Sequence, residues 1–67
     1  MNLHTCTIVL NNQLKLTSSS VDQSLGFIDQ YGHSSIEKVL IDASENGQIH
    51  SFHHLSLEES IESLMDL

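Results

Sequence analysis

Residues 36–52 read IEKVLIDASENGQIHSF and carry the strongest short-range structural signal in the chain. The first six residues are rich in β-branched and apolar side chains, which favours a strand. Asn46-Gly47 predicts the two-residue turn of a β-hairpin, because both residue types tolerate a positive φ. That turn places four side chains on one face: Ile41 opposite Phe52, and Val39 opposite His54. We expect Leu55 to end the second strand.

A helix is predicted directly after this hairpin. Ser56-Leu57-Glu58-Glu59 has the pattern of a capping box, in which the serine and the glutamate three residues later each satisfy the other's backbone N–H. Apolar residues then recur at helical spacing up to the last residues: Leu57, Ile61, Leu64 and Met65. The stripe indicates a helix with one buried face.

An earlier helix is predicted over Val21–Tyr31. Ser20 and Gln23 form a second candidate capping box, and Gly32 suits the position just past a helix end. Gly26 lies inside this helix and weakens it by about 1 kcal/mol relative to alanine. Either Gly26 is closely packed against another element or the helix is only marginally stable; of the two, we expect close packing.

A further hairpin is predicted over residues 5–17, with Asn11-Asn12 as a two-residue turn and the register left open. Under that turn Val9 and Leu14 share one face. The opposite face carries Cys6, Ile8 and Leu10. Because one layer of two short helices covers only one side of a sheet, an apolar patch remains. We expect a homodimer whose interface contains Cys6, Ile8 and Leu10.

The two halves of the chain, about residues 5–32 and 36–67, resemble each other. At an offset of 36 residues, SVDQSL (20–25) aligns with SLEESI (56–61). The halves predict a single α+β domain, residues 1–67, of ββαββα order. In it a four-stranded antiparallel sheet has both helices on one face, with a pseudo-twofold internal repeat. If the similarity reflects only two capped amphipathic helices, the order of elements is unchanged.

Charge limits the classes of function. Nine Asp and Glu residues stand against Lys15 and Lys38, Arg is absent, and the formal net charge is −7. Direct nucleic-acid binding is not expected, because phosphate contacts need Lys and Arg, and an anionic membrane would repel the chain. The field instead attracts basic protein surfaces. Without a long apolar run or a signal peptide, we expect a cytoplasmic protein, in its own cell or in a host.

No constellation of residues predicts catalysis or a bound metal. On a strand, neighbours point to opposite faces and residues four apart lie about 13 Å from each other, so His50, His53 and His54 do not share one ion. Residues 42–47 resemble the first half of an EF-hand calcium loop, but His53 stands where its bidentate glutamate belongs. Cys6 lacks neighbours that activate a thiol. We therefore expect no enzyme, no metal and no cofactor.

The last helix carries a row of acidic residues. Glu58, Glu62 and Asp66 lie at i, i+4 and i+8, about 6 Å apart along the axis, with no lysine to offset them. Asp66 also opposes the helix dipole, so stability alone does not explain the row; a solvated face is the plain alternative. The candidate partner-binding residues are Glu58, Glu59, Glu62, Asp66, Asp22 and Asp29.

Two hypotheses of function follow. Short, acidic, cysteine-poor chains are similar in composition to small inhibitors encoded by phages and other mobile elements. The first hypothesis is an inhibitor or adaptor that blocks a basic nucleic-acid-handling protein, as a DNA mimic or anti-defence protein. The alternative is a structural dimerisation module, or an antitoxin-like subunit, that binds through an apolar surface. Charge-driven capture weakens steeply with salt and apolar contact does not, so ionic strength distinguishes the two.

Overall fold

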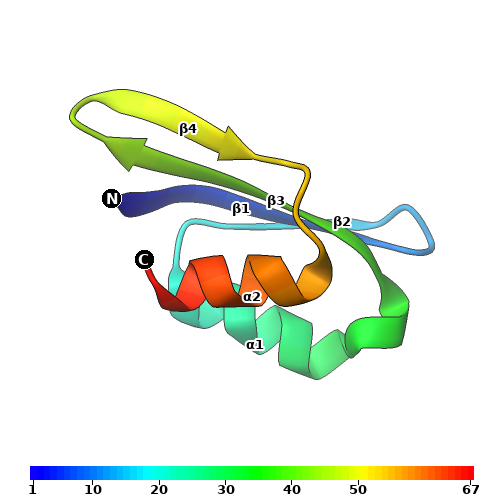
Figure 1. The fold of residues 1–67 in the computed structure, drawn as a ribbon. Coiled ribbons are helices and arrows are strands. Elements are labelled where there is room, and N and C mark those ends of the chain that lie inside the picture. Colours follow the sequence, from blue (N-terminus) through cyan, green and yellow to red (C-terminus); the bar gives the residue numbers. More distant parts are fainter.

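A computed structural model of the chain describes residues 1–67 and contains a four-stranded antiparallel sheet with two helices on one face (Figure 1). The elements in chain order are β1 (Asn2–Leu10), β2 (Lys15–Ser18), α1 (Val21–Tyr31), a short 3-10 turn (His33–Ser35), β3 (Ile36–Glu45), β4 (Gln48–Phe52) and α2 (Leu57–Met65). The strand order across the sheet is β2-β1-β3-β4. The α+β class and the ββαββα order are confirmed. The internal repeat is not, because the two hairpins differ in strand length and in loop length.

The β3–β4 hairpin closes through the predicted Asn46-Gly47 turn. Asn46 has φ 53° and Gly47 has φ 80°, the left-handed conformation that this turn requires at both positions. Ile41 lies opposite Phe52, as predicted. However, β4 ends at Phe52, so the prediction that Val39 pairs with His54 and that Leu55 ends the strand was wrong. The chain must leave the sheet after Phe52 to reach the helix layer (Figure 1).

The β1–β2 hairpin has a three-residue loop, so the prediction of a two-residue turn at Asn11-Asn12 was wrong. The N–H of Leu10 donates to the carbonyl of Leu14 (2.8 Å), and Gln13 adopts a positive φ of 75°. The side chain of Asn12 supports the loop by accepting a hydrogen bond from the N–H of Leu14 (3.0 Å). A two-residue turn would have placed Lys15 opposite Ile8 under the helices. The longer loop places Leu16 there.

Both helices begin at the predicted serines. The hydroxyl of Ser56 accepts from the N–H of Glu59 and the Glu59 carboxylate accepts from the N–H of Ser56, which completes a capping box. At α1, the Ser20 hydroxyl accepts from the N–H of Gln23 (3.3 Å), but the N–H of Ser20 donates to Ser18 instead of to Gln23. Only the second helix therefore has the full reciprocal cap.

The expectation of close packing at Gly26 was wrong. This residue is exposed, and no atom of another element lies within 4 Å of the position that a Cβ would take. Gly32, by contrast, has φ 82° at the end of α1, where its N–H donates to the carbonyl of Ile28. A glycine is needed at the helix end and not within the helix.

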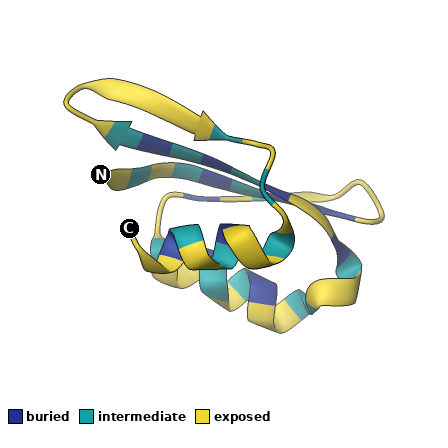
Figure 2. Cartoon of the chain, in the orientation of Figure 1, coloured by how far each residue is buried: buried dark blue, intermediate teal, exposed yellow.

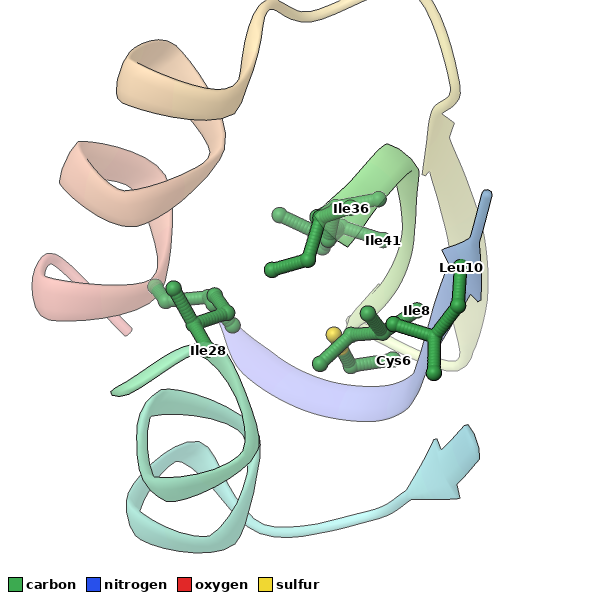
Figure 3. Close-up of a cluster of buried hydrophobic side chains, with 8 residues drawn as sticks. Cys6, Ile8, Leu10, Ile28, Ile36 and Ile41 are labelled. Atoms are coloured by element: carbon green, nitrogen blue, oxygen red, sulfur yellow. The ribbon is translucent and has the colours of Figure 1, made fainter. Parts of the chain in front are cut away.

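The core lies between the sheet and the two helices (Figures 2 and 3). Its buried residues come from both central strands and both helices: Cys6, Ile8, Leu10, Ile28, Ile36, Val39, Ile41 and Leu64. Two serines, Ser24 and Ser60, are also fully buried on the inner faces of the helices. The hydroxyl of Ser24 donates to the carbonyl of Ser20 (2.8 Å), whereas that of Ser60 has no partner. Small side chains there allow the helices to approach the apolar layer closely.

The residues expected at a dimer interface are part of this core. Cys6 and Ile8 are 0% exposed and Leu10 is 4% exposed, and all three face the helices (Figure 3). The physical reason is that the helices cover the more apolar side of β1, which is the side that these residues share. The expectation that Cys6, Ile8 and Leu10 contact a second copy is therefore wrong for this fold, and self-association would need another surface.

Candidate functional site

The two helices carry most of the negative charge of the molecule. Six of the nine acidic residues lie on them or at their ends, all six are exposed, and neither helix contains Lys or Arg. Both lysines lie on strands, Lys15 in β2 and Lys38 in β3. We define the helix-layer surface by its six acids: Asp22, Asp29, Glu58, Glu59, Glu62 and Asp66. The charge of the molecule is thus concentrated on one side.

The acidic row on α2 is placed as the sequence predicts. Glu58, Glu62 and Asp66 are exposed, and α2 is helical from Leu57 to Met65, so successive carboxylates rise by about 6 Å. Asp66 caps the helix, and its N–H donates to the carbonyl of Glu62 (3.1 Å). The last turn of α2 holds no basic residue, so nothing within the helix offsets the negative charge at this end.

Glu59 has a different role from the other acids. Its Oε1 accepts a hydrogen bond from the N–H of Ser56 (3.0 Å) within the capping box. This backbone hydrogen bond, together with the bond to the Ser56 side chain, lowers the pKa of Glu59 below its usual range. The carboxylate is charged and held in place, but one of its oxygens is already occupied. We therefore regard Glu59 as a capping residue that adds charge to the surface.

The two acids of α1 extend the surface across the helix layer. Asp22 lies in the first turn of α1 and Asp29 near its end, and both are exposed. The helices run in opposite directions side by side (Figure 1), so Asp22 lies at the same end of the layer as Asp66. Asp29, near the end of α1, lies at the end of the layer where α2 begins. Both ends of the layer are therefore acidic.

The face of the sheet away from the helices has a different character. Lys15 and Lys38 both lie opposite Val9, one on each neighbouring strand, so the three side chains form one row across this open face. Both helices lie on the other side of the sheet, and no other element covers this face (Figure 1). The only lysines of the chain thus lie on the opposite side of the sheet from the acidic surface.

A small polar cluster on the open face was missed in the sequence. Asp42 Oδ1 accepts a hydrogen bond from the hydroxyl of Ser51 (2.6 Å) and lies 2.9 Å from Nε2 of His53. The bond from Ser51, and then the contact with His53, lower the pKa of the Asp42 carboxyl. The Asn46-Gly47 register already implied that Asp42 lies opposite Ser51. The missing step was to read that pairing for polar partners.

The remaining sequence candidates are the thiol of Cys6, the EF-hand-like residues 42–47 and the histidines. Burial raises the pKa of the Cys6 thiol, so this side chain is protonated as well as inaccessible. No group of three or more His, Cys, Asp or Glu side chains is placed to hold a metal ion. Residues 42–47, which resemble part of an EF-hand loop, form the end of β3 and a hairpin turn. His50 lies in β4 and His53 directly after it, so neither belongs to a calcium-binding loop.

Two open clefts of about 270 Å³ each mark the surface. One lies between the β1–β2 loop and the end of α1, and Leu10, Leu14 and Tyr31 supply its apolar lining. The other lies between β3, β4 and the end of α2, and its lining includes Met1, Ile41, Phe52 and Asp66.

Comparisons with protein-family models, curated proteins and solved structures each found no match to this chain. Neither helix combines the length and the apolar character needed to cross a membrane. The case for a function therefore depends on the distribution of charge and exposed groups described above.

Proposed function

We propose that this chain is a small acidic inhibitor or adaptor that uses the helix-layer surface to bind a protein with a basic surface. The observation that carries the proposal is the separation of charge. Six acids and no cations lie on the helices, while both lysines lie on the sheet. A surface charged in this way steers and retains basic partners.

The basic surfaces that the proposal favours are those that normally hold nucleic acid. Rows of carboxylates on exposed helices present fixed negative charges to Lys and Arg side chains, as phosphates do. Occupying such a groove would exclude DNA or RNA from it. The proposed class is a DNA mimic or an anti-defence protein of a phage or mobile element, acting in the cytoplasm without catalysis.

Charge reversal with a matched control tests the proposal. The double variant Glu58→Lys, Glu62→Lys changes the net charge from −7 to −3, and so does Glu37→Lys, Glu45→Lys, which alters exposed acids of β3. We expect the helix variant to lose at least about tenfold in capture of lysate proteins, and the strand variant to lose much less. Added duplex DNA should displace the captured proteins. Equal losses in both variants would mean that net charge, and not this surface, drives binding.

A second candidate function is a dimerisation module or antitoxin-like subunit. Four large apolar residues are 49% to 63% exposed: Met1, Leu14, Ile49 and Met65. Exposed apolar side chains of this kind favour contact with another chain. Capture that persists unchanged from low to moderate ionic strength would support this candidate and count against the acidic surface.

A further inference from the structure

The two edges of the sheet differ in how they are protected. The edge strand β2 has four residues and carries Lys15, and a charged residue on an edge strand discourages pairing with another chain. The other edge strand, β4, contains no charged residue. Residues 46–57 as a whole contain no Lys, Arg, Asp or Glu. The β4 edge therefore lacks the usual protection against pairing.

The turn before β4 determines which of its backbone groups face outward. Residues that flank a two-residue turn form a hydrogen-bonded pair, and such pairs alternate along an antiparallel ladder. Gln48, His50 and Phe52 therefore direct their backbone groups toward β3. Ile49 and Ser51 direct theirs away from it. None of the backbone hydrogen bonds outside the helices and strands involves Ile49 or Ser51, so these groups have no partner in the molecule.

The side chains of β4 are exposed as well. All of its residues except Phe52 are exposed, and Ile49, a large apolar residue, is 51% exposed. Figure 2 shows the β3–β4 arm reaching past the helix layer with its outer strand exposed along its length. Neither helix stands in the way of another strand there.

We propose that β4 pairs antiparallel with β4 of a second copy of the chain, about a twofold axis through His50. In this register Ile49 lies opposite the partner's Ser51, and His50 lies opposite the partner's His50. The outward N–H and C=O groups of Ile49 and Ser51 then form four hydrogen bonds with those of the partner. The two sheets become one sheet of eight strands.

The β4 edge fits a second copy of itself because its outward groups are self-complementary in this register, and charge favours this edge over other surfaces as the place where two copies meet. Two copies of a chain with net charge −7 repel each other, most strongly where one acidic helix layer would approach another. Pairing along β4 brings together only uncharged residues. The twofold axis stands perpendicular to the sheet, so both helix layers lie on the same side, next to each other and not face to face. This pairing does not depend on the proposed function.

The size of the interface sets its strength. Two five-residue strands bury an area at or below about 1,200 Å², the range of weak and transient complexes. We therefore expect an equilibrium between monomer and dimer that shifts with protein concentration. A dimer that persists at the lowest concentrations would need a larger surface than this edge.

Sedimentation velocity at mildly alkaline pH tests the proposal. The mean mass should rise above the 7.5 kDa monomer as the concentration increases from about 10 μM to about 1 mM. Ile49→Pro removes an outward N–H that β3 does not use, and it should weaken dimerisation at least about tenfold. Ile49→Thr keeps that N–H and should weaken it far less. A chain that stays monomeric at about 1 mM, or an Ile49→Pro variant that dimerises normally, would overturn the proposal.

Amide hydrogen exchange gives a second measurement that needs no variant. Protection of the Ile49 and Ser51 amides should increase with concentration, because dimerisation occupies them. Leu14→Ser, which alters an exposed apolar residue near the β2 edge, should leave both the mass and this protection unchanged. Concentration-dependent protection confined to other segments would place the interface elsewhere and refute the β4 pairing.

Discussion

The two hairpins reach the same antiparallel pairing by different means. In the β3–β4 hairpin, Asn46 and Gly47 are residue types suited to their positive φ values, so the turn itself sets the register. In the β1–β2 hairpin, Gln13 adopts φ 75° without being suited to it. There the packing of the partly buried Leu16 against the core sets the register, and the loop adopts the length that this requires. Where the turn residues suit the backbone conformation, the turn determines the strand register. Where they do not, packing in the core determines the register.

The largest expected effect tests whether both hairpins share one core. Ile8 of β1 and Ile41 of β3 are each 0% exposed, so Ile8→Ala and Ile41→Ala should each cost about 2–5 kcal/mol of unfolding free energy. That is a large part of the stability of a small domain. Urea denaturation followed by circular dichroism measures it. A loss confined to one of the two variants would show that the hairpins are stabilised separately.

The next test alters the turn that sets its own register. Gly47 has φ 80°, where a Cβ is strained, so Gly47→Ala should cost about 1–2 kcal/mol. No atom stands near the added Cβ, so the cost comes from the backbone conformation alone. The same denaturation measurement applies, and Gly26→Ala within α1 is the control because it should stabilise the protein. A neutral Gly47→Ala would contradict a role for this turn.

The helix caps that follow the two hairpins should differ. Ser56→Ala removes a complete capping box and should cost about 1 kcal/mol. Ser20→Ala removes one 3.3 Å hydrogen bond with no reciprocal partner, so we expect a smaller loss. Thermal unfolding of both variants, side by side with the wild type, compares them. The reverse order would mean that the reciprocal bond from Glu59 adds nothing.

A substitution at Gln13, in the β1–β2 loop, should change stability in the opposite direction to the one at Gly47. Gln13→Gly relieves the left-handed strain at Gln13 but increases the freedom of the unfolded chain, so a net gain of about 0.5 kcal/mol is expected. Gln13→Ala, which keeps the strain, should give no gain. Precise chemical denaturation is required for an effect of this size. A destabilised Gln13→Gly variant would show that the loop is not strained.

The smallest expected effect concerns pH and only the second hairpin. Hydrogen bonds from Ser51 and His53 lower the pKa of Asp42 in the folded state, so its charged form stabilises the fold. This contribution is complete above the unfolded pKa of about 3.9 and is lost as pH falls through the lower folded value. Asp42→Asn should therefore lose less stability than the wild type on acidification from neutral pH. Ser51→Ala should reduce the wild-type loss of stability on acidification more than His53→Ala does, because the Ser51 hydrogen bond lowers the pKa of Asp42 most.

Strong local signals made part of the fold predictable. The bounds of α1, both N-cap serines, and the pairing of Ile41 with Phe52 follow from capping and turn chemistry that involves neighbours in sequence. The loop of the first hairpin was not predictable in this way, because its register depends on burying Leu16 against distant residues. The end of β4 likewise depends on the path to α2, which only the assembled layers determine.

The candidate site was predictable in its exposure but not in all of its roles. The positions of Glu58, Glu62 and Asp66 on an exposed helix face follow from helical periodicity. The side of β1 that the helices cover did not follow, because both faces of the first hairpin carry apolar residues. Sequence reasoning therefore assigned Cys6 and Ile8 to a surface. The β4 edge was missed because an edge is a property of strand order.

The burial of Cys6 makes the molecule its own unfolding reporter. This single thiol lies in a central strand that pairs with Ser18 of β2 on one side and with Ile41 of β3 on the other, and it is 0% exposed. Because its side chain faces the helices, a thiol reagent must wait for the helix layer to separate from the sheet, or for the whole fold to open, before it reacts. When opening and closing are fast relative to labelling, the modification rate of the unaltered protein follows the fraction of molecules that are open. The stability of the fold can thus be read in a dilute or crowded mixture without a fluorescent label or an engineered cysteine.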